Sequence, residues 1–184
     1  MDMMDKAKLQ PMLPYIGVPV IGAALLILRA GSADPFIMLR YLMLVVFGYF
    51  AAVLDLKAKR IPNSLVLAML ASWILVMAPK LFLDTHMAIA LLVDSAIGLA
   101  IAGGMFLIVY LVSRKGLGGG DVKFMAAAGL YLGSGGVLPS MLCGTVLAAL
   151  TGLVLILMKK IGRKDAIPLA PFLYIGILIT IFLL

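Results

Sequence analysis

Two aspartates stand at the ends of long apolar runs, and they are the side chains best suited to chemistry. Asp55 lies in the stretch AAVLDLKAKRIPN, and Asp121 lies in RKGLGGGDVKFMAAAGLYLG. They are 121 − 55 = 66 residues apart, with two apolar runs between them. Because two membrane crossings return a chain to the same face, both carboxyls can lie at a similar depth. A close pair of carboxyls shares one proton, which suits general acid–base hydrolysis.

Each aspartate also has an ordinary interpretation without catalysis. Asp121 precedes a predicted helix and would serve as its N-cap. Asp55 stands close to three cations, Lys57, Lys59 and Arg60, and would serve as an interfacial ion-pair partner. The two acids taken together, with a glycine run directly before one of them, favour a catalytic pair.

The glycine run before Asp121 predicts an irregular backbone. Four of the five residues from 116 to 120 are glycine, so we expect no stable helix there. Irregular backbone near membrane depth is tolerated where it lines a wet cavity. We therefore expect Gly118, Gly119 and Gly120 to bind a substrate chain through backbone hydrogen bonds. The run lacks the phosphate-loop pattern G-x-x-x-x-G-K-[ST].

The composition indicates which elements position these residues. The chain has 184 residues, of which 65% are hydrophobic and 12% charged, with a mean hydropathy of +1.22. Soluble domains are about 45–50% apolar and about 25% charged. We therefore predict an all-α polytopic membrane protein with about six to seven transmembrane helices. The expected spans are 14–30, 36–54, 63–83, 87–112, 137–158 and 167–184.

A shorter run, 122–133, is rich in small residues and is either a further span or a re-entrant helix. If it crosses, the N-terminus is cytoplasmic and the basic loops all face the cytoplasm, as the positive-inside rule requires. Those loops carry Lys57, Lys59, Arg60, Arg114, Lys115, Lys123, Lys159, Lys160, Arg163 and Lys164. A re-entrant helix would place the last basic loop outside, which the same rule disfavours.

The whole chain, 1–184, is expected to form one membrane domain. Residues 1–35 read as an extra N-terminal span that is retained, although they resemble a signal peptide, and 36–184 form the core. Asp94 lies within the fourth span, about 28 Å of helix from Ser113, so we expect it towards the external side in a structural role. Pro62 is expected to end the preceding segment, and Asn63 to cap the next helix.

Several site classes are excluded. The single cysteine, Cys143, and the single histidine, His86, allow no intrachain disulfide and no cysteine- or histidine-based metal site. All eight acids are aspartates. We expect no metal and no cofactor. The net charge of +7 does not indicate nucleic-acid binding, because no basic face with interleaved aromatics is present.

Three motifs occur in order: DLKAKRIPN at 55–63, GGGDVK at 118–123 and IPLAPF at 167–172. Together they resemble the type IV prepilin peptidase family, a group of membrane aspartic proteases with a GxGD motif. The resemblance covers about residues 36–184, although IPFGPF is the more usual spelling of the last motif. It implies that Asp55 and Asp121 are catalytic, and that the protein removes the leader peptide of prepilins at the cytoplasmic face of the membrane.

The resemblance is to the short form of the family, similar to the peptidases of Flp/Tad pilus systems. Long members carry a cysteine-containing zinc insertion and also methylate the new N-terminus. The single cysteine here implies a peptidase without N-methyltransferase activity. The implied partners are Flp-like prepilins and the bilayer of the bacterial inner membrane. Family substrates usually carry an acid shortly after the cleavage site, and Lys123 is the expected contact for it. The oligomeric state is left open.

Two other classes of protein fit some of the same features. A small transporter or channel also uses intramembrane acids and broken helices, although it favours acids near the midplane and repeated halves. Proton flux in liposomes would support it. A non-catalytic subunit of a pilus-assembly machine predicts that changing either aspartate to asparagine leaves function intact.

Overall fold

The computed structural model describes residues 34–113, 116–160, 162 and 167–183, which form helices and their connections without a strand. The helices are α3 (Pro35–Ala58), α4 (Asn63–Leu83), α5 (Thr85–Val112), α6 (Gly119–Leu157) and α7 (Ala170–Leu183). The predicted all-α class is confirmed. Four of the helices are long and apolar enough to cross a membrane, whereas α7 has 14 residues. The expected count of six to seven is not confirmed, and the expected span 14–30 lies outside the described residues.

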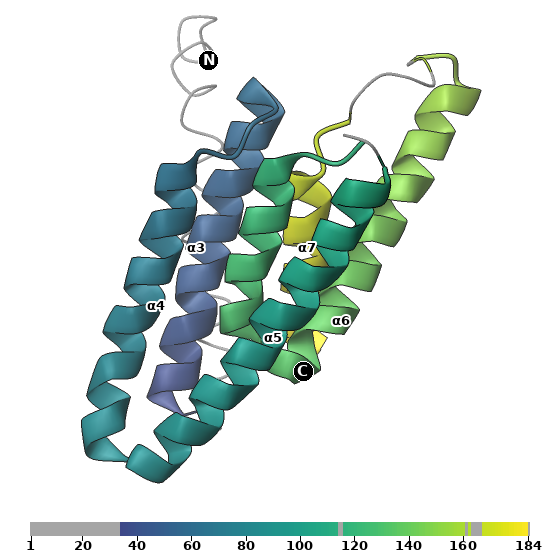
Figure 1. Cartoon of the computed structure of the whole chain (residues 1–184). Helices are drawn as coiled ribbons and strands as arrows, with labels where there is room; N and C mark the ends of the chain where they lie inside the picture. The colour runs from purple at the N-terminus through teal and green to yellow at the C-terminus, as the bar shows by residue number, and fades with distance from the viewer. Residues whose placement is uncertain (1–33, 114–115, 161, 163–166, 184) are drawn as a thin grey trace, which may run out of the picture.

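The helices form one bundle in which both ends of α6 lie at the same end as the α3–α4 connection and the start of α7 (Figure 1). We call this the basic end, because Lys57, Lys59 and Lys159 lie in its helix termini and connections. The described parts of the three basic loops therefore share one end, in agreement with the orientation that the charge distribution favours.

A break at Gly133 divides α6 into two segments that run in opposite directions (Figure 1). Gly133 has φ 69° and ψ −174°, a conformation that essentially only glycine adopts. The first segment packs closely on α5, since a Cβ on Gly98 would lie 2.3 Å from the Gly129 carbonyl oxygen. The second segment returns along α7, with Gly144 against Leu173.

The run 122–133, which the sequence left as a span or a re-entrant helix, belongs to the first segment of α6. That segment covers residues 119–132, or about 21 Å of helix, which is shorter than the hydrocarbon core of about 30 Å. It starts at the basic end, and the second segment brings the chain back there. The end of α6, with Lys159 and Lys160 directly after it, thus lies at the basic end, as the seven-crossing register requires.

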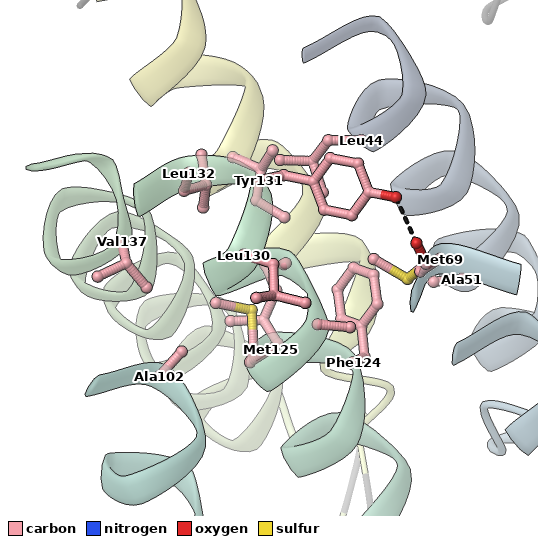
Figure 2. Close-up of a cluster of buried hydrophobic side chains, with 14 of the residues drawn as sticks. Leu44, Ala51, Met69, Ala102, Phe124, Met125, Leu130, Tyr131, Leu132 and Val137 are labelled. Atoms are coloured by element: carbon pink, nitrogen blue, oxygen red, sulfur yellow. Dashed lines mark hydrogen bonds between the residues drawn. The ribbon is translucent and has the colours of Figure 1, made fainter. Parts of the chain in front are cut away.

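A buried cluster lies directly beyond the start of α6 (Figure 2). Phe124 and Met125 follow Asp121 by one helical turn, and both are fully buried. At the other end of the segment, the Tyr131 hydroxyl donates to the Met69 carbonyl of α4 at 2.5 Å. Van der Waals packing and interhelical hydrogen bonds hold helices together in a bilayer. Both therefore fix the first segment of α6 against its neighbours.

The opposite end of the bundle is held by an ion pair between α3 and α4. Asp34 caps α3 by accepting a hydrogen bond from the Phe36 N–H at 2.9 Å, and it pairs with Lys80. The Lys80 ammonium also lies 4.8 Å from the centre of the Phe36 ring. The hydrogen bond from Lys80, followed by that from Phe36, holds the pKa of Asp34 below its usual value. This contact involves no residue of α6.

Candidate active site

Asp55 lies in the last turns of α3 at the basic end, and its side chain is buried. Its Oδ2 accepts a hydrogen bond from the Ala170 N–H at 3.0 Å. Ala170 is the first residue of α7, and the first N–H groups of a helix have no partner within it. The positive end of the α7 dipole therefore faces the Asp55 carboxylate and stabilises its negative charge.

Asp121 lies in the first turn of α6 and is also buried. The alternative interpretation of Asp121 as an N-cap is wrong, because Gly118 holds the N-cap position and α6 begins at Gly119. The Asp121 N–H donates to the Gly118 carbonyl at 3.1 Å. Its side-chain Oδ1 has no hydrogen-bond partner among the described residues, although it is buried. A buried polar atom left without a partner is costly, so a role for this oxygen is needed.

The two aspartates line the same pair of adjoining cavities, of about 200 and about 300 Å³. Both cavities are bounded by Asp55, Asp121, Lys59 and Gly118. The smaller extends along the glycine run towards Arg60, and the larger extends towards residues 167–169. The fold thus brings together two carboxyls that are far apart in the sequence.

Close contacts, as well as the turn, favour glycine at positions 118 and 120. A Cβ on Gly118 would lie 2.7 Å from the Asp121 Oδ2, and one on Gly120 would lie 3.2 Å from the Ile61 Cβ. The irregular backbone is shorter than expected, because Gly119 and Gly120 already belong to the first turn of α6. Gly118 and Gly119 are exposed beside the two carboxyls.

Lys123 is exposed, and its Nζ donates to the Asn63 Oδ1 at 2.9 Å. Asn63 therefore does not cap α4 as expected: Pro62 holds that position without a side-chain hydrogen bond. Lys123 borders a separate hollow of about 380 Å³ with Tyr110 and Gly119, outside the two cavities that the carboxyls line. Its role in substrate binding stays a prediction.

Sequence reasoning missed three contributors to this site. Lys59 adopts φ 50° at the end of α3 and lines both cavities. In the sequence it is one of three neighbouring cations, and nothing distinguishes it from Lys57. Ile61 is buried against the glycine run. The Ala170 N–H is a backbone donor, which a side-chain inventory overlooks. The available signal for it was the last of the three motifs, in which Pro168 comes before the start of α7 and Pro171 lies in its first turn.

Comparison with known proteins points to one family. The model of the family described as "Type IV leader peptidase family" matches residues 42–157. A "Prepilin leader peptidase/N-methyltransferase" of Xanthomonas campestris pv. campestris is 28% identical over 124 residues, 67% of this chain and 42% of the relative. Proteins of the same name from Legionella pneumophila and Burkholderia pseudomallei are each 32% identical, over 70% and 76% of this chain and 44% and 46% of theirs. The chain spans less than half the length of these relatives. No solved structure matches.

Proposed function

Because the chain belongs to the type IV leader peptidase family, as its motifs predict, we propose that it is an aspartic endopeptidase that removes the leader peptide of prepilins. One observation carries the proposal: two buried aspartates from different helices, Asp55 and Asp121, line the same cavities at one end of the bundle. In a purely structural pair, the buried carboxyl oxygens would be expected to accept hydrogen bonds from the protein. The Asp121 Oδ1, in contrast, has no hydrogen-bond partner among the described residues.

The two carboxyls divide the work of hydrolysis. The Ala170 N–H favours the negative charge on Asp55, so Asp55 removes a proton from a water molecule as its oxygen attacks the scissile carbonyl carbon. Asp121 carries the shared proton and donates a hydrogen bond to the developing oxyanion. When the C–N bond breaks, the leaving amine takes a proton from the pair, and the pair returns to its starting state.

The substrate lies extended across the exposed glycine run. Gly118 and Gly119 leave their backbone groups accessible beside the carboxyls, which suits hydrogen bonding to an extended chain. We propose that Lys123, whose Nζ donates to the Asn63 Oδ1, contacts an acid of the substrate after the cleavage site. We propose Flp-like prepilins as substrates, cleaved at the cytoplasmic face of the bacterial inner membrane without methyl transfer.

The test is cleavage of a co-expressed Flp-type prepilin by wild type, Asp55→Asn and Asp121→Asn. We expect wild type to release the leader and each variant to lose about 10²- to 10⁴-fold in rate, because positioned acid–base groups contribute that much. Blotting of precursor and mature pilin, with protein levels matched, measures the loss. The mass of the mature N-terminus reports whether a methyl group has been added.

Asp84→Asn is the control, because it neutralises an exposed aspartate at the start of α5 that lines neither cavity. Full processing by either Asp55→Asn or Asp121→Asn would overturn the catalytic pair. A methylated mature N-terminus would overturn the proposal of peptidase activity alone.

A further inference from the structure

The break in α6 exposes backbone groups that a continuous helix would pair internally. In an α-helix the Ser134 N–H would donate to the Leu130 carbonyl. Here it donates to the Asp94 Oδ1 at 2.9 Å, because Gly133 leaves the helical conformation. The carbonyls before the break are then free to accept from other helices. Within a bilayer such groups must be satisfied by protein, since lipid offers no hydrogen bonds.

Arg40 of α3 satisfies the carbonyls on one side of the break. Its Nη2 donates to the Leu130 and Tyr131 carbonyls at 3.0 and 2.9 Å and lies 3.3 Å from the Ser95 hydroxyl. The Trp73 indole N–H gives the Leu130 carbonyl a second donor at 3.1 Å. Arg40 is only 3% exposed, and its Nε has no partner among the described residues. A buried guanidinium inside a bundle is costly to keep, so it marks a function.

Asp94 of α5 satisfies the other side of the break. Its Oδ1 also accepts from the Ser134 hydroxyl at 2.5 Å. A cation thus lies at the C-terminal end of the first segment of α6, and an anion lies at the N-terminal end of the second. Each charge is opposite in sign to the helix end that it meets, which is the stabilising arrangement.

We propose that Arg40 and Asp94 are positioning residues that clamp the break in α6 and so hold Asp121 in place beside Asp55. The clamped end of the first segment is 133 − 121 = 12 residues from Asp121, or about 18 Å of rigid helix. A shift of the clamped end therefore moves the Asp121 carboxyl along or across its cavity. This inference deepens the proposed function, since a displacement of about 1 Å in a catalytic group can cost about 100-fold in rate.

The first measurement reports position and needs no activity. In the full chain with Cys143→Ala, the pair Ile61→Cys and Gly120→Cys should form a disulfide on mild oxidation. The Gly120 Cβ position lies 3.2 Å from the Ile61 Cβ, within a few tenths of an ångström of disulfide geometry. Arg40→Met and Asp94→Ala should slow the disulfide about tenfold. Labelling of unreacted thiols with a maleimide polymer measures the rate on a gel.

Lys80→Met is the control, because it removes another buried cation, whose ion pair with Asp34 involves no residue of α6. It should leave the rate of disulfide formation unchanged. An unchanged rate in Arg40→Met, or an equal slowing in Lys80→Met, would overturn the clamp. Should Arg40→Met fail to accumulate, Trp73→Phe removes one of the two donors to the Leu130 carbonyl and should slow the disulfide by a smaller factor; no slowing there would count against the clamp.

The second measurement separates positioning from a general loss of structure. With the native residues at 61 and 120, Arg40→Met should lower kcat for prepilin cleavage at least about tenfold while KM stays within about twofold. Arg40→Lys should recover part of kcat, since an ammonium can reach one of the carbonyls. A normal kcat would overturn the inference. Slowed disulfide formation in a protein that cleaves no prepilin would support the clamp and overturn the proposed function instead.

Discussion

Asp94 of α5 and Asp121 of α6 each lie beside the N-terminal end of a segment of α6, but their hydrogen bonding differs. We expect this difference to distinguish a structural carboxyl from a catalytic one. Asp94, at the break, accepts hydrogen bonds from both the N–H and the hydroxyl of Ser134. Asp121, at the basic end, lines two cavities and leaves its Oδ1 without a partner among the described residues. An oxygen that is satisfied within the protein has little to offer a substrate, whereas one that is buried and unpaired does.

The same contrast extends to the glycines of the two regions. At the break, Gly133 is required by its backbone conformation and by contact with Asp94. At the proposed active site, Gly118 is exposed and faces the Asp121 carboxyl. We therefore expect substitution of Gly133 to act first on folding, and substitution of Gly118 to act on activity while the fold is kept.

The largest effect is expected for Gly133→Ala. An added Cβ would lie 1.9 Å from the Asp94 Oδ2, and an L-residue is strained at φ 69°. We expect a destabilisation of about 3 kcal/mol or more, from strain together with the displaced carboxylate. Thermal unfolding in detergent, followed by loss of monodisperse protein, measures it.

Gly135→Ala is the control for that substitution. It lies two residues further along α6, and a Cβ there meets nothing within 4 Å. It should be neutral or stabilising by about 0.5–1 kcal/mol, as alanine is in a helix interior. Equal destabilisation by the two alanines would remove the distinction between a structural break and an ordinary helix position.

A smaller effect, on activity, is expected for Ala170→Pro. Proline is tolerated at the first position of a helix, and it removes the N–H that donates to Asp55. A hydrogen bond to a charged group contributes about 1.5–3 kcal/mol, so kcat for prepilin cleavage should fall about 10- to 100-fold. Ala170→Gly keeps the donor and should retain most of kcat. Similar losses in both would show that packing at residue 170, rather than the N–H, supports Asp55.

Much of this arrangement can be predicted from the sequence, because hydrophobic run length fixes where helices lie. The expected spans 63–83 and 87–112 match α4 and α5 to within two residues. The shared end of Asp55 and Asp121 follows from two intervening spans. The break at Gly133 could not be predicted in the same way, since many membrane helices contain glycine and a positive φ depends on the partner helix. The pairing of Arg40 with carbonyls 90 residues away is likewise a property of the packed bundle alone.

The smallest effect distinguishes two ways in which the glycine run can matter. Gly118→Ala places a Cβ 2.7 Å from the Asp121 Oδ2, so it should turn the carboxyl and lower kcat about tenfold. Gly119→Ala, one residue on, meets only the Tyr110 ring, at 3.9 Å.

If the run acts by fitting around Asp121, Gly119→Ala should keep kcat within about twofold, and neither variant should change thermal stability. If the run acts mainly by admitting the substrate backbone, both alanines should raise KM together with kcat unchanged, because each narrows the same exposed surface. Steady-state cleavage of a purified prepilin by the two variants separates these outcomes, and a loss of stability in Gly118→Ala would place that glycine with Gly133 rather than with the active site.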